Sequence, residues 1–202
     1  MQRNIILGSL VILGGVFLLS GCGTTSESTA QNFTEPAIDQ PGRTIMRYRG
    51  PEVEVLVDYK FAAQSLGDGW LILNVAVTGR ESRSEEIARR SIKVKMPDGR
   101  KVSIPEHKEF TRAYPEYQSA ARRAALASSP LDFTKAGRRS CDLAFQPLPG
   151  TGIALESVHV NFRRICQGLL YFPIPGGVQP GNWTFIIELE EGEVRVPFVL
   201  EP

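Results

Sequence analysis

From Val53 onward, apolar and polar residues alternate with a period of two, and this alternation restricts the fold more than any other feature of the chain. Residues 53–61 place valines and aromatic residues at odd positions and mostly charged residues at even ones, as in a strand with one buried face. In residues 70–77 nearly every position is apolar, which predicts a central strand covered on both faces. Further strands are expected at residues 141–145 and 157–163. Frequent short strands between turn signals predict an all-β fold, an antiparallel β-sandwich.

Two hairpins have a predictable register. The first surrounds Pro97-Asp98-Gly99, a three-residue loop that needs Gly99 in the left-handed conformation and pairs Val94 with Val102. All of these features agree with one another, so the turn chemistry and the side-chain pattern predict the same hairpin.

The second hairpin is predicted at the C-terminus, where apolar residues alternate on both sides of a glutamate-rich turn. Its expected register places Phe185 opposite Phe198 in the core and Glu188 opposite Arg195 at the surface. Because Pro197 has no N–H, we expect a loop of four residues and a final strand at a sheet edge.

One helix is expected among the strands, within an insertion over residues 105–140. Pro115 suits a helical first turn, and Arg122 and Arg123 fall outside the apolar stripe that follows it. The stripe has helical spacing and consists of Tyr117, Ala120, Ala121 and Ala124. The predicted fold is therefore an antiparallel β-sandwich with one helical insertion.

Residues 1–21 have the features of a secretion signal. Arg3 provides the positive start, and Ile5–Leu19 is an apolar run of fifteen residues without a charge. The quartet Leu19-Ser20-Gly21-Cys22 resembles the lipobox of bacterial lipoproteins. In that family the peptide is cut just before the cysteine, whose thiol carries a diacylglycerol. An uncleaved membrane helix is the weaker alternative, because roughly 20 residues are needed to cross a bilayer.

The resemblance implies lipidation of Cys22 and anchoring of the protein to a membrane of the cell envelope. In bacteria with two membranes, Gly23 after the cysteine resembles the sorting pattern for the outer membrane. Residues 22–50 are rich in Ser, Thr, Gln, Pro and Gly, so we expect a flexible tether there. Residues 51–202 are expected to form one domain. The strand pattern of this part resembles immunoglobulin-like domains of bacterial surface lipoproteins, which implies architecture and not activity.

Cys141 and Cys166 remain once Cys22 is lipidated, an even number in a compartment where disulfides persist. Both lie on the apolar side of their own segments, so they can meet in the core. We expect a disulfide between them, and two free buried thiols are the alternative.

Charge is segregated along the chain although the net charge is only +1. Residues 80–140 hold fifteen Lys or Arg against eight Asp or Glu, whereas residues 182–202 hold one Arg against five Glu. The pattern favours two solvated faces of opposite sign, with a basic docking face as the alternative. The near-zero net charge gives no indication of nucleic acid as a partner.

Residues that could carry chemistry are few. His107 and His159 are far apart and have no paired spacing, so a metal site has little support. His159 belongs to a polar row on the outward side of its segment, which a ligand or simply solvent could cover. The one thiol–imidazole pairing is Cys141 with His159, and the apolar position of Cys141 suits a disulfide better than a thiolate. We therefore expect no catalytic site, no metal and no cofactor.

Residues 169–175 combine five large apolar residues with two prolines, which we expect to keep the segment out of a central strand. The segment either folds over one end of the sandwich and closes the core, or forms an exposed patch for a partner or a membrane. The aromatic residues of the insertion pose the same question. They are Phe110, Tyr114, Tyr117 and Phe133.

The leading hypothesis is a non-catalytic, lipid-anchored envelope protein that presents its sandwich to another envelope protein or to a cell-wall component. The alternative is a module that binds glycans or small ligands through the aromatic residues of the insertion together with Arg122 or Arg123. An enzyme is the third and weakest hypothesis.

Overall fold

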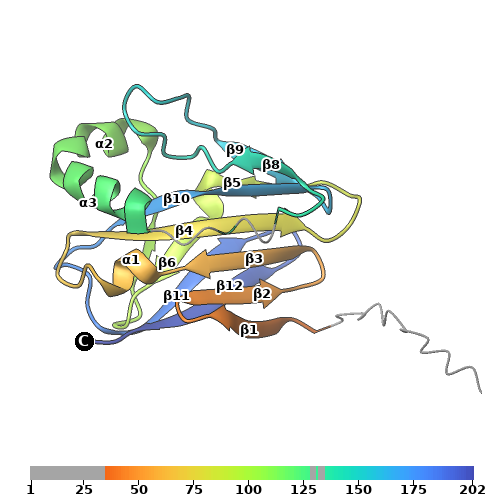
Figure 1. Ribbon diagram of the computed structural model, residues 1–202, viewed down its shortest axis with the longest axis horizontal. Coiled ribbons are helices and arrows are strands. Elements are labelled where there is room, and N and C mark those ends of the chain that lie inside the picture. Colours follow the sequence, from red (N-terminus) through yellow and green to blue (C-terminus); the bar gives the residue numbers. More distant parts are fainter. Residues whose placement is uncertain (1–34, 128–130, 132–134) are drawn as a thin grey trace, which may run out of the picture. The chain divides into compact units, whose positions relative to one another are not determined.

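A computed structural model describes residues 35–127, 131 and 135–202 (Figure 1). The expected signal segment, Cys22 and Phe133 lie outside the described residues. Within the described part the chain is an antiparallel β-sandwich with a small helical insertion, as the alternation of apolar residues predicts.

The larger sheet has six strands in the order β1-β2-β3-β4-β10-β8. They are β1 (Ala37–Gly42), β2 (Ile45–Arg49), β3 (Val53–Asp58), β4 (Trp70–Gly79), β8 (Arg139–Asp142) and β10 (Arg164–Pro173). Neighbouring strands are antiparallel except β8, which runs parallel to β10. β4 lies between β3 and β10 and is buried along its whole length, which confirms the central strand predicted over residues 70–77.

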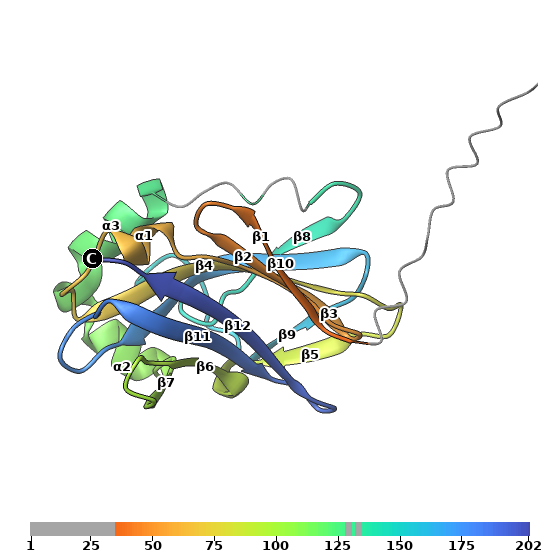
Figure 2. The same cartoon turned by 90° about the horizontal axis from the view of Figure 1, so that it is seen from below.

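Two smaller sheets cover the inner face of the larger one (Figure 2). The four-stranded sheet has the order β12-β11-β6-β7, with β6 (Ile92–Lys95), β7 (Lys101–Ser103), β11 (Gly181–Glu188) and β12 (Glu193–Leu200). The two-stranded sheet pairs β5 (Glu85–Ala88) with β9 (Ser157–Val160). The main core lies between these layers and includes Val55, Leu73, Val158 and Phe185.

Helices cover the outer face of β4 and β10 (Figure 1). They are α1 (Lys60–Ala63), α2 (His107–Arg112) and α3 (Tyr114–Ala127), and a short 3-10 helix, η1 (Arg89–Ser91), precedes β6. α3 buries the four residues of the predicted stripe, and Tyr117 packs with Trp70 and Tyr171 in a second apolar cluster. α2 was not predicted, and it adds Phe110 to that cluster.

The hairpin of β6 and β7 forms as predicted. Val94 lies opposite Val102, and Gly99 has a φ of +89°, in the left-handed region. The Gly99 N–H donates to the carbonyl of Met96 at 2.9 Å, which closes the turn.

The C-terminal hairpin forms, but its register differs by two residues from the predicted one. Phe185 lies opposite Val196 and not opposite Phe198, and Arg195 lies opposite Ile186 and not opposite Glu188. Both predicted pairings are therefore wrong. A shift of two residues keeps every side chain on its own face, so Phe185 and Phe198 are still buried in the core.

The turn explains the difference. Leu189 N–H donates to the carbonyl of Gly192 at 2.8 Å, so only two residues form the connection. Hydrogen-bonded and non-bonded pairs alternate from this point, which puts Pro197 in a non-bonded pair with Thr184. The missing N–H of Pro197 thus faces away from β11 without a longer loop. β12 is an edge strand, as predicted.

The expected tether over residues 22–50 is wrong for residues 37–49, which form the β1–β2 hairpin. Ile45 and Tyr48 are buried on opposite faces of the sheet. Arg47 forms an ion pair with Asp39 across the two strands. Two apolar residues give a weak pattern for predicting strands from the sequence. Together with one cross-strand ion pair they can still stabilise a hairpin that pairs with an existing sheet.

Residues 169–173 belong to β10, in a part of that strand that has a neighbouring strand on one side only among the described residues, as the prolines predict. β8 pairs with β10 only up to Gln167, and from there one side of β10 has no strand beside it in the described chain. Pro173 is the last residue of β10 and needs no partner on that side. The segment is buried and closes the core, and the alternative of an exposed apolar patch is wrong.

Candidate functional site

A groove with a volume of about 700 Å³ runs between the edge strand β12 and the β1–β2 hairpin. We call it the edge groove. Its lining comes from β1, β2, the turn between them, β11, β12 and both ends of α1. It consists of Gln40, Arg43, Thr44, Met46, Tyr59, Ala63, Asn182, Trp183, Thr184, Pro197, Phe198, Val199 and Glu201. Polar side chains are thus combined with a group of aromatic rings.

Three aromatic rings form the floor of the edge groove. The rings of Tyr59 and Phe198 are stacked with centroids 5.2 Å apart, and Trp183 stacks on Phe198 at 6.5 Å. Trp183 Nε1 donates to the carbonyl of Gln179 at 2.9 Å, so the indole has its polar partner within the protein. All three residues are buried, with exposed fractions of 9% for Tyr59, 3% for Phe198 and 1% for Trp183, so they close the bottom of the groove and do not project into it.

Hydrogen bonds fix the β1–β2 turn, which forms one wall. Tyr59 donates its N–H to the carbonyl of Thr44 at 2.9 Å and its hydroxyl to the carbonyl of Arg43 at 3.2 Å. Thr44 Oγ1 donates to Asp58 Oδ1 at 2.9 Å. Burial, with the charge of Glu201 as a smaller cause, raises the pKa of Tyr59. The phenol therefore stays neutral and keeps donating at physiological pH.

The other wall offers backbone groups. The alternation of hydrogen-bonded pairs along β11 and β12 points the N–H and C=O of Arg195 and Val199 away from β11. At Pro197 only the C=O is available there. A short extended segment can pair with such an edge, while Pro197 limits how far a continuous ladder can extend. The edge groove therefore joins backbone donors and acceptors to an apolar floor.

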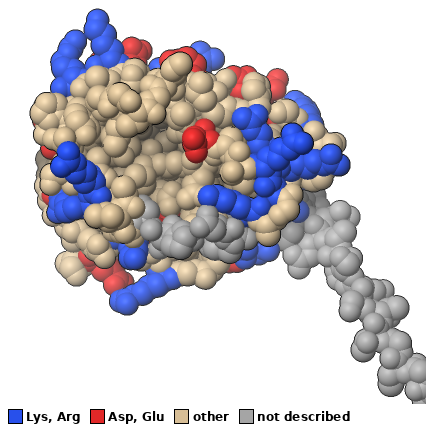
Figure 3. All heavy atoms as spheres, turned by 45° about the horizontal axis from the view of Figure 1, so that its top comes forward, with Lys and Arg blue, Asp and Glu red and all other residues tan. Residues whose placement is uncertain are grey.

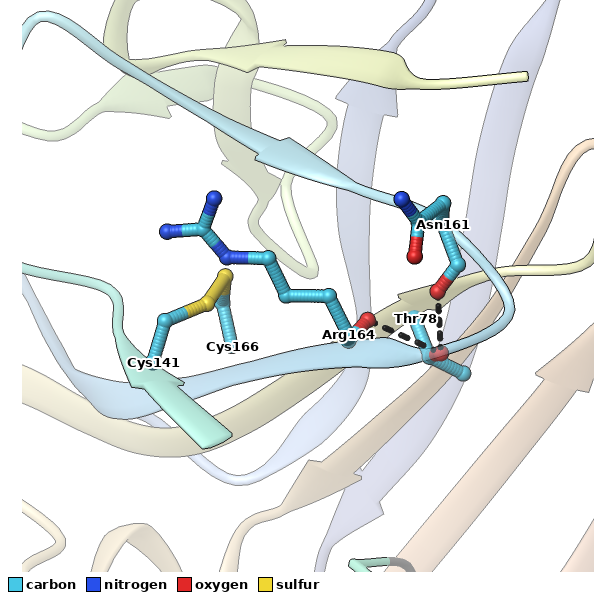
Figure 4. Close-up of a disulfide and its surroundings, with 5 residues drawn as sticks. All are labelled: Thr78, Cys141, Asn161, Arg164 and Cys166. Carbon is cyan, nitrogen blue, oxygen red and sulfur yellow. Dashed lines mark hydrogen bonds between the residues drawn. A yellow bond between two sulfur atoms is a disulfide. The ribbon is translucent and has the colours of Figure 1, made fainter. Parts of the chain in front are cut away.

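Cys141 and Cys166 form a disulfide that joins β8 to β10, with Cα atoms 4.4 Å apart (Figure 4). This confirms the predicted bridge and excludes the alternative of two free thiols. A disulfide sulfur is not a thiolate, so the pairing of Cys141 with His159 as a nucleophile and base is excluded as well.

The two histidines lie on separate elements. His159 is exposed on β9, opposite Glu86 of β5, and His107 is the first residue of α2. Within residues 35–127, 131 and 135–202 no three His, Cys, Asp or Glu side chains gather in a way that could hold a metal ion.

Two of the three described aromatic residues of the insertion offer no surface for a glycan, and the third, Tyr114, is half-buried against Tyr117. Phe110 and Tyr117 are fully buried between the helices and the sheet. Arg123 lies over the ring of Phe61 at 5.6 Å and donates to Asp68 at 3.1 Å. Arg122 is exposed on the other side of the stripe.

The expectation of two separate faces of opposite charge is wrong for the acidic C-terminal hairpin. Its glutamates form ion pairs with basic residues of the segment 80–140. These pairs include Lys93 with Glu188 at 2.5 Å, Arg83 with Glu191 at 3.2 Å and Lys101 with Glu193 at 3.8 Å. Much of the charge segregation along the chain is therefore neutralised within the fold.

The sequence interpretation missed the edge groove because Gln40, Arg43 and Thr44 fell in the expected tether. The alternation of Met46 and Tyr48 with arginines was the signal that could have revealed the second strand of that hairpin. No family model, curated protein or solved structure matches this chain. Among the residues that the structure describes, no helix has the length and apolar character to cross a membrane.

Proposed function

We propose that this chain is a non-catalytic lipoprotein of the bacterial cell envelope that binds an extended segment of another envelope protein in the edge groove. The lipobox resemblance at Leu19–Cys22 supports the anchor. Each buried methylene of an acyl chain contributes about 0.8 kcal/mol, so two or three chains hold a protein on a membrane for practical purposes permanently.

The edge groove is the observation that carries the binding role. An extended peptide needs main-chain partners and a place for its apolar side chains. The free edge at Val199 supplies the first, and the stacked rings of Tyr59 and Phe198 supply the second. The exposed rim residues Arg43 and Glu201 carry opposite charges, which can select the direction of the bound segment.

Site-specific photo-crosslinking in cells tests this role. A photoreactive amino acid replaces Val199 at the groove, and in a control it replaces Ile153, which is exposed far from the groove lining. We expect one discrete protein adduct from position 199 and none from position 153. Arg43→Glu should reduce the adduct, and Arg122→Glu should not. Equal crosslinking from both positions, or an adduct that Arg43→Glu leaves unchanged, would contradict the role of the groove.

Binding of a glycan in the same groove is the second candidate. The polar rim residues Gln40, Arg43 and Asn182, beside Tyr59 in the same groove, are a combination that also suits sugars. Pull-down of the purified protein with peptidoglycan separates the two candidates. If peptidoglycan retains the wild type, and Asn182→Ala and Gln40→Ala abolish this retention, the glycan is favoured. If the protein forms the crosslinked adduct but is not retained by peptidoglycan, the peptide is favoured.

A further inference from the structure

Several chain ends and turns meet at one end of the sandwich, on the right in Figure 1. Ala37, the first residue of β1, lies opposite Arg49, which leads into the turn before β3. Gly79 lies opposite Val53 at the end of β4. The described chain therefore enters the sheet at the same end at which β4 finishes.

The turn between β9 and β10 is fixed at this end. Thr78 Oγ1 lies 3.2 Å from the carbonyl oxygen of Asn161 and 3.1 Å from that of Arg164 (Figure 4). A Cβ atom on Gly79 would lie only 2.5 Å from the Cα of Asn161, so the backbones are in close contact. The position of the turn is thus determined by packing and hydrogen bonding to β4.

Three arginines lie at this turn: Arg139, Arg163 and Arg164. We call them the arginine cluster. Arg139 and Arg164 lie directly opposite each other in the parallel pair of β8 and β10, and Arg139 N–H donates to the carbonyl of Arg163 at 2.7 Å. The disulfide joins the same two strands two residues further on. The fold therefore holds these like charges side by side.

The charge of the arginine cluster is not neutralised by the described protein. No carboxylate of the described residues lies within 4.0 Å of Arg139, Arg163 or Arg164, although Glu81 and Asp142 are near in the chain or the fold. Like charges placed opposite each other across two strands are destabilising. Figure 3 shows a group of basic side chains on the right of the view and others at its left and bottom, so basic surface is open to an anionic partner on this face.

An aromatic ring lies within the arginine cluster. Phe162 is 42% exposed, and the guanidinium carbon of Arg163 lies 4.9 Å from the centroid of its ring. Arg138, the neighbour of Arg139 in the chain, donates from Nε to the Phe162 carbonyl at 3.3 Å, which holds the two segments together. Aromatic rings beside basic residues are typical of protein surfaces that lie in the headgroup region of a membrane.

We propose that the arginine cluster, with Phe162, docks on the phosphate headgroups of anionic phospholipids and orients the sandwich on the membrane. The proposal rests on the lipid anchor of the proposed function. The chain from Cys22 to Ala37 can span at most about 50 Å, and it enters the domain at the end that carries the cluster. The anchor is therefore connected to the domain at this end, whereas the helices lie at the opposite end (Figure 1). Guanidinium groups bind phosphate oxygens in a bidentate geometry, which favours phosphate headgroups as the partner.

Fluorescence energy transfer in vesicles tests the docking on the lipidated full chain. A donor dye is attached at Ser82→Cys, in the exposed loop after β4, and acceptor lipids are placed in the vesicle surface. Vesicles of phosphatidylglycerol with phosphatidylcholine are compared with vesicles of phosphatidylcholine alone. We expect the protein to be retained by both kinds of vesicle, with high energy transfer only on the anionic one and a loss of that transfer at high salt.

Charge reversal locates the surface. Each basic residue near an anionic membrane changes the ratio of docked to undocked protein by about fivefold. Arg139→Glu, Arg163→Glu and Arg164→Glu together should lower that ratio by about a hundredfold or more. The matched control reverses Lys108, Arg112 and Arg122, which are exposed on α2 and α3, and should leave the ratio within a fewfold of wild type.

The outcomes separate the docking from the anchor. Equal energy transfer on neutral and anionic vesicles, or an equal loss for the cluster and control variants at unchanged melting temperature, would overturn the docking. Failure of the protein to stay on either kind of vesicle would instead contradict the lipid anchor of the proposed function. A third outcome is high energy transfer on neutral vesicles that disappears when a soluble acidic protein is added. That result would assign the cluster to a protein partner and would also overturn the proposal.

Discussion

A single buried side chain completes the hydrogen bonding of β10 where its neighbour β8 has ended. Tyr171 N–H donates to Gln146 Oε1 at 2.9 Å, and Gln146 Nε2 donates to the Tyr171 carbonyl, also at 2.9 Å. The amide thus replaces one residue of a missing strand. It satisfies two backbone groups that are enclosed between the sheet and the helical insertion.

Gln146→Leu should therefore lower the free energy of unfolding markedly, although it replaces a polar side chain with an apolar one at a buried position. Each buried backbone group that loses its partner costs about 1 to 3 kcal/mol, so for two groups the expected loss is about 2 to 6 kcal/mol. Urea denaturation measures it. Gln40→Leu, at an exposed amide, is the control and should change stability by less than about 0.5 kcal/mol. Equal effects of the two substitutions would show that the Gln146 bonds contribute little.

The disulfide is the second residue-scale feature with a measurable consequence. A bridge between cysteines 25 residues apart restricts the unfolded chain and stabilises the fold by about 3 kcal/mol. For a domain of this size, reduction should lower the melting temperature by roughly 6 to 12 °C. Calorimetry with and without reductant measures the shift, and Cys141→Ala with Cys166→Ala should be insensitive to reductant. An unchanged wild-type melting temperature on full reduction would contradict a stabilising bridge.

The two residue-scale features differ in how far sequence could predict them. The disulfide was predictable because both cysteines share the apolar side of their segments and form an even pair. The role of Gln146 was not, since its partner is a backbone amide that carries no sequence signal and lies 25 residues away.

At the scale of elements, alternation predicts which face a side chain lies on but not its register. In the C-terminal hairpin the predicted and observed registers bury the same residues, because a shift of two leaves each face unchanged. Turn geometry decides between them, and a glutamate-rich turn gives no clear signal for its length. The turn of β6 and β7 contains Gly99 and was predicted correctly for that reason.

Engineered cysteine pairs test the register directly. Asn182 lies opposite Val199 in a non-bonded pair, where Cα atoms are about 4.5 Å apart and suit a disulfide. Asn182→Cys with Val199→Cys should form a second bridge on mild oxidation, and mass spectrometry of an unreduced digest would detect it. In the register shifted by two, Asn182 would instead face Glu201. A bridge in the Asn182→Cys, Glu201→Cys variant and none in the first would contradict the observed hairpin.

The helices over β4 and β10 enclose tyrosines whose titration reports on folding. Burial, with a contribution from Tyr114, raises the pKa of Tyr171 to about 12, and burial also raises the pKa of Tyr117. An unfolded tyrosine titrates near pH 10. Between pH 10 and 12 the unfolded chain therefore binds fewer protons than the folded one, so stability falls as the pH rises.

Urea denaturation at pH 9 and pH 11 checks this dependence. The wild type should lose stability between the two pH values, and Tyr171→Phe should reduce that loss by on the order of 1 kcal/mol. Between pH 7 and 9 the free energy of unfolding should change by the same amount in the two proteins. The same loss above pH 9 in both proteins would mean that Tyr171 is accessible to water in the folded state.

At the scale of the whole molecule, local patterns predicted the sandwich, its central strand and the stripe of α3. The edge groove and the arginine cluster could not be predicted in this way. Both depend on turns that are distant in sequence and meet only after the sheets have packed. The β1–β2 hairpin also has too few apolar residues to be distinguished from a tether before the sheet is known.

The proposed function of the whole molecule depends on a membrane anchor at Cys22. Radiolabelled palmitate in cells that express either wild type or Cys22→Ala, followed by membrane fractionation, tests it most directly. We predict label on the wild type, membrane association of that protein, and loss of both in the variant, with the Cys141–Cys166 bridge and the melting temperature unchanged. A Cys22→Ala protein that still fractionates with membranes, or a wild type without label, would contradict the lipid anchor at Cys22.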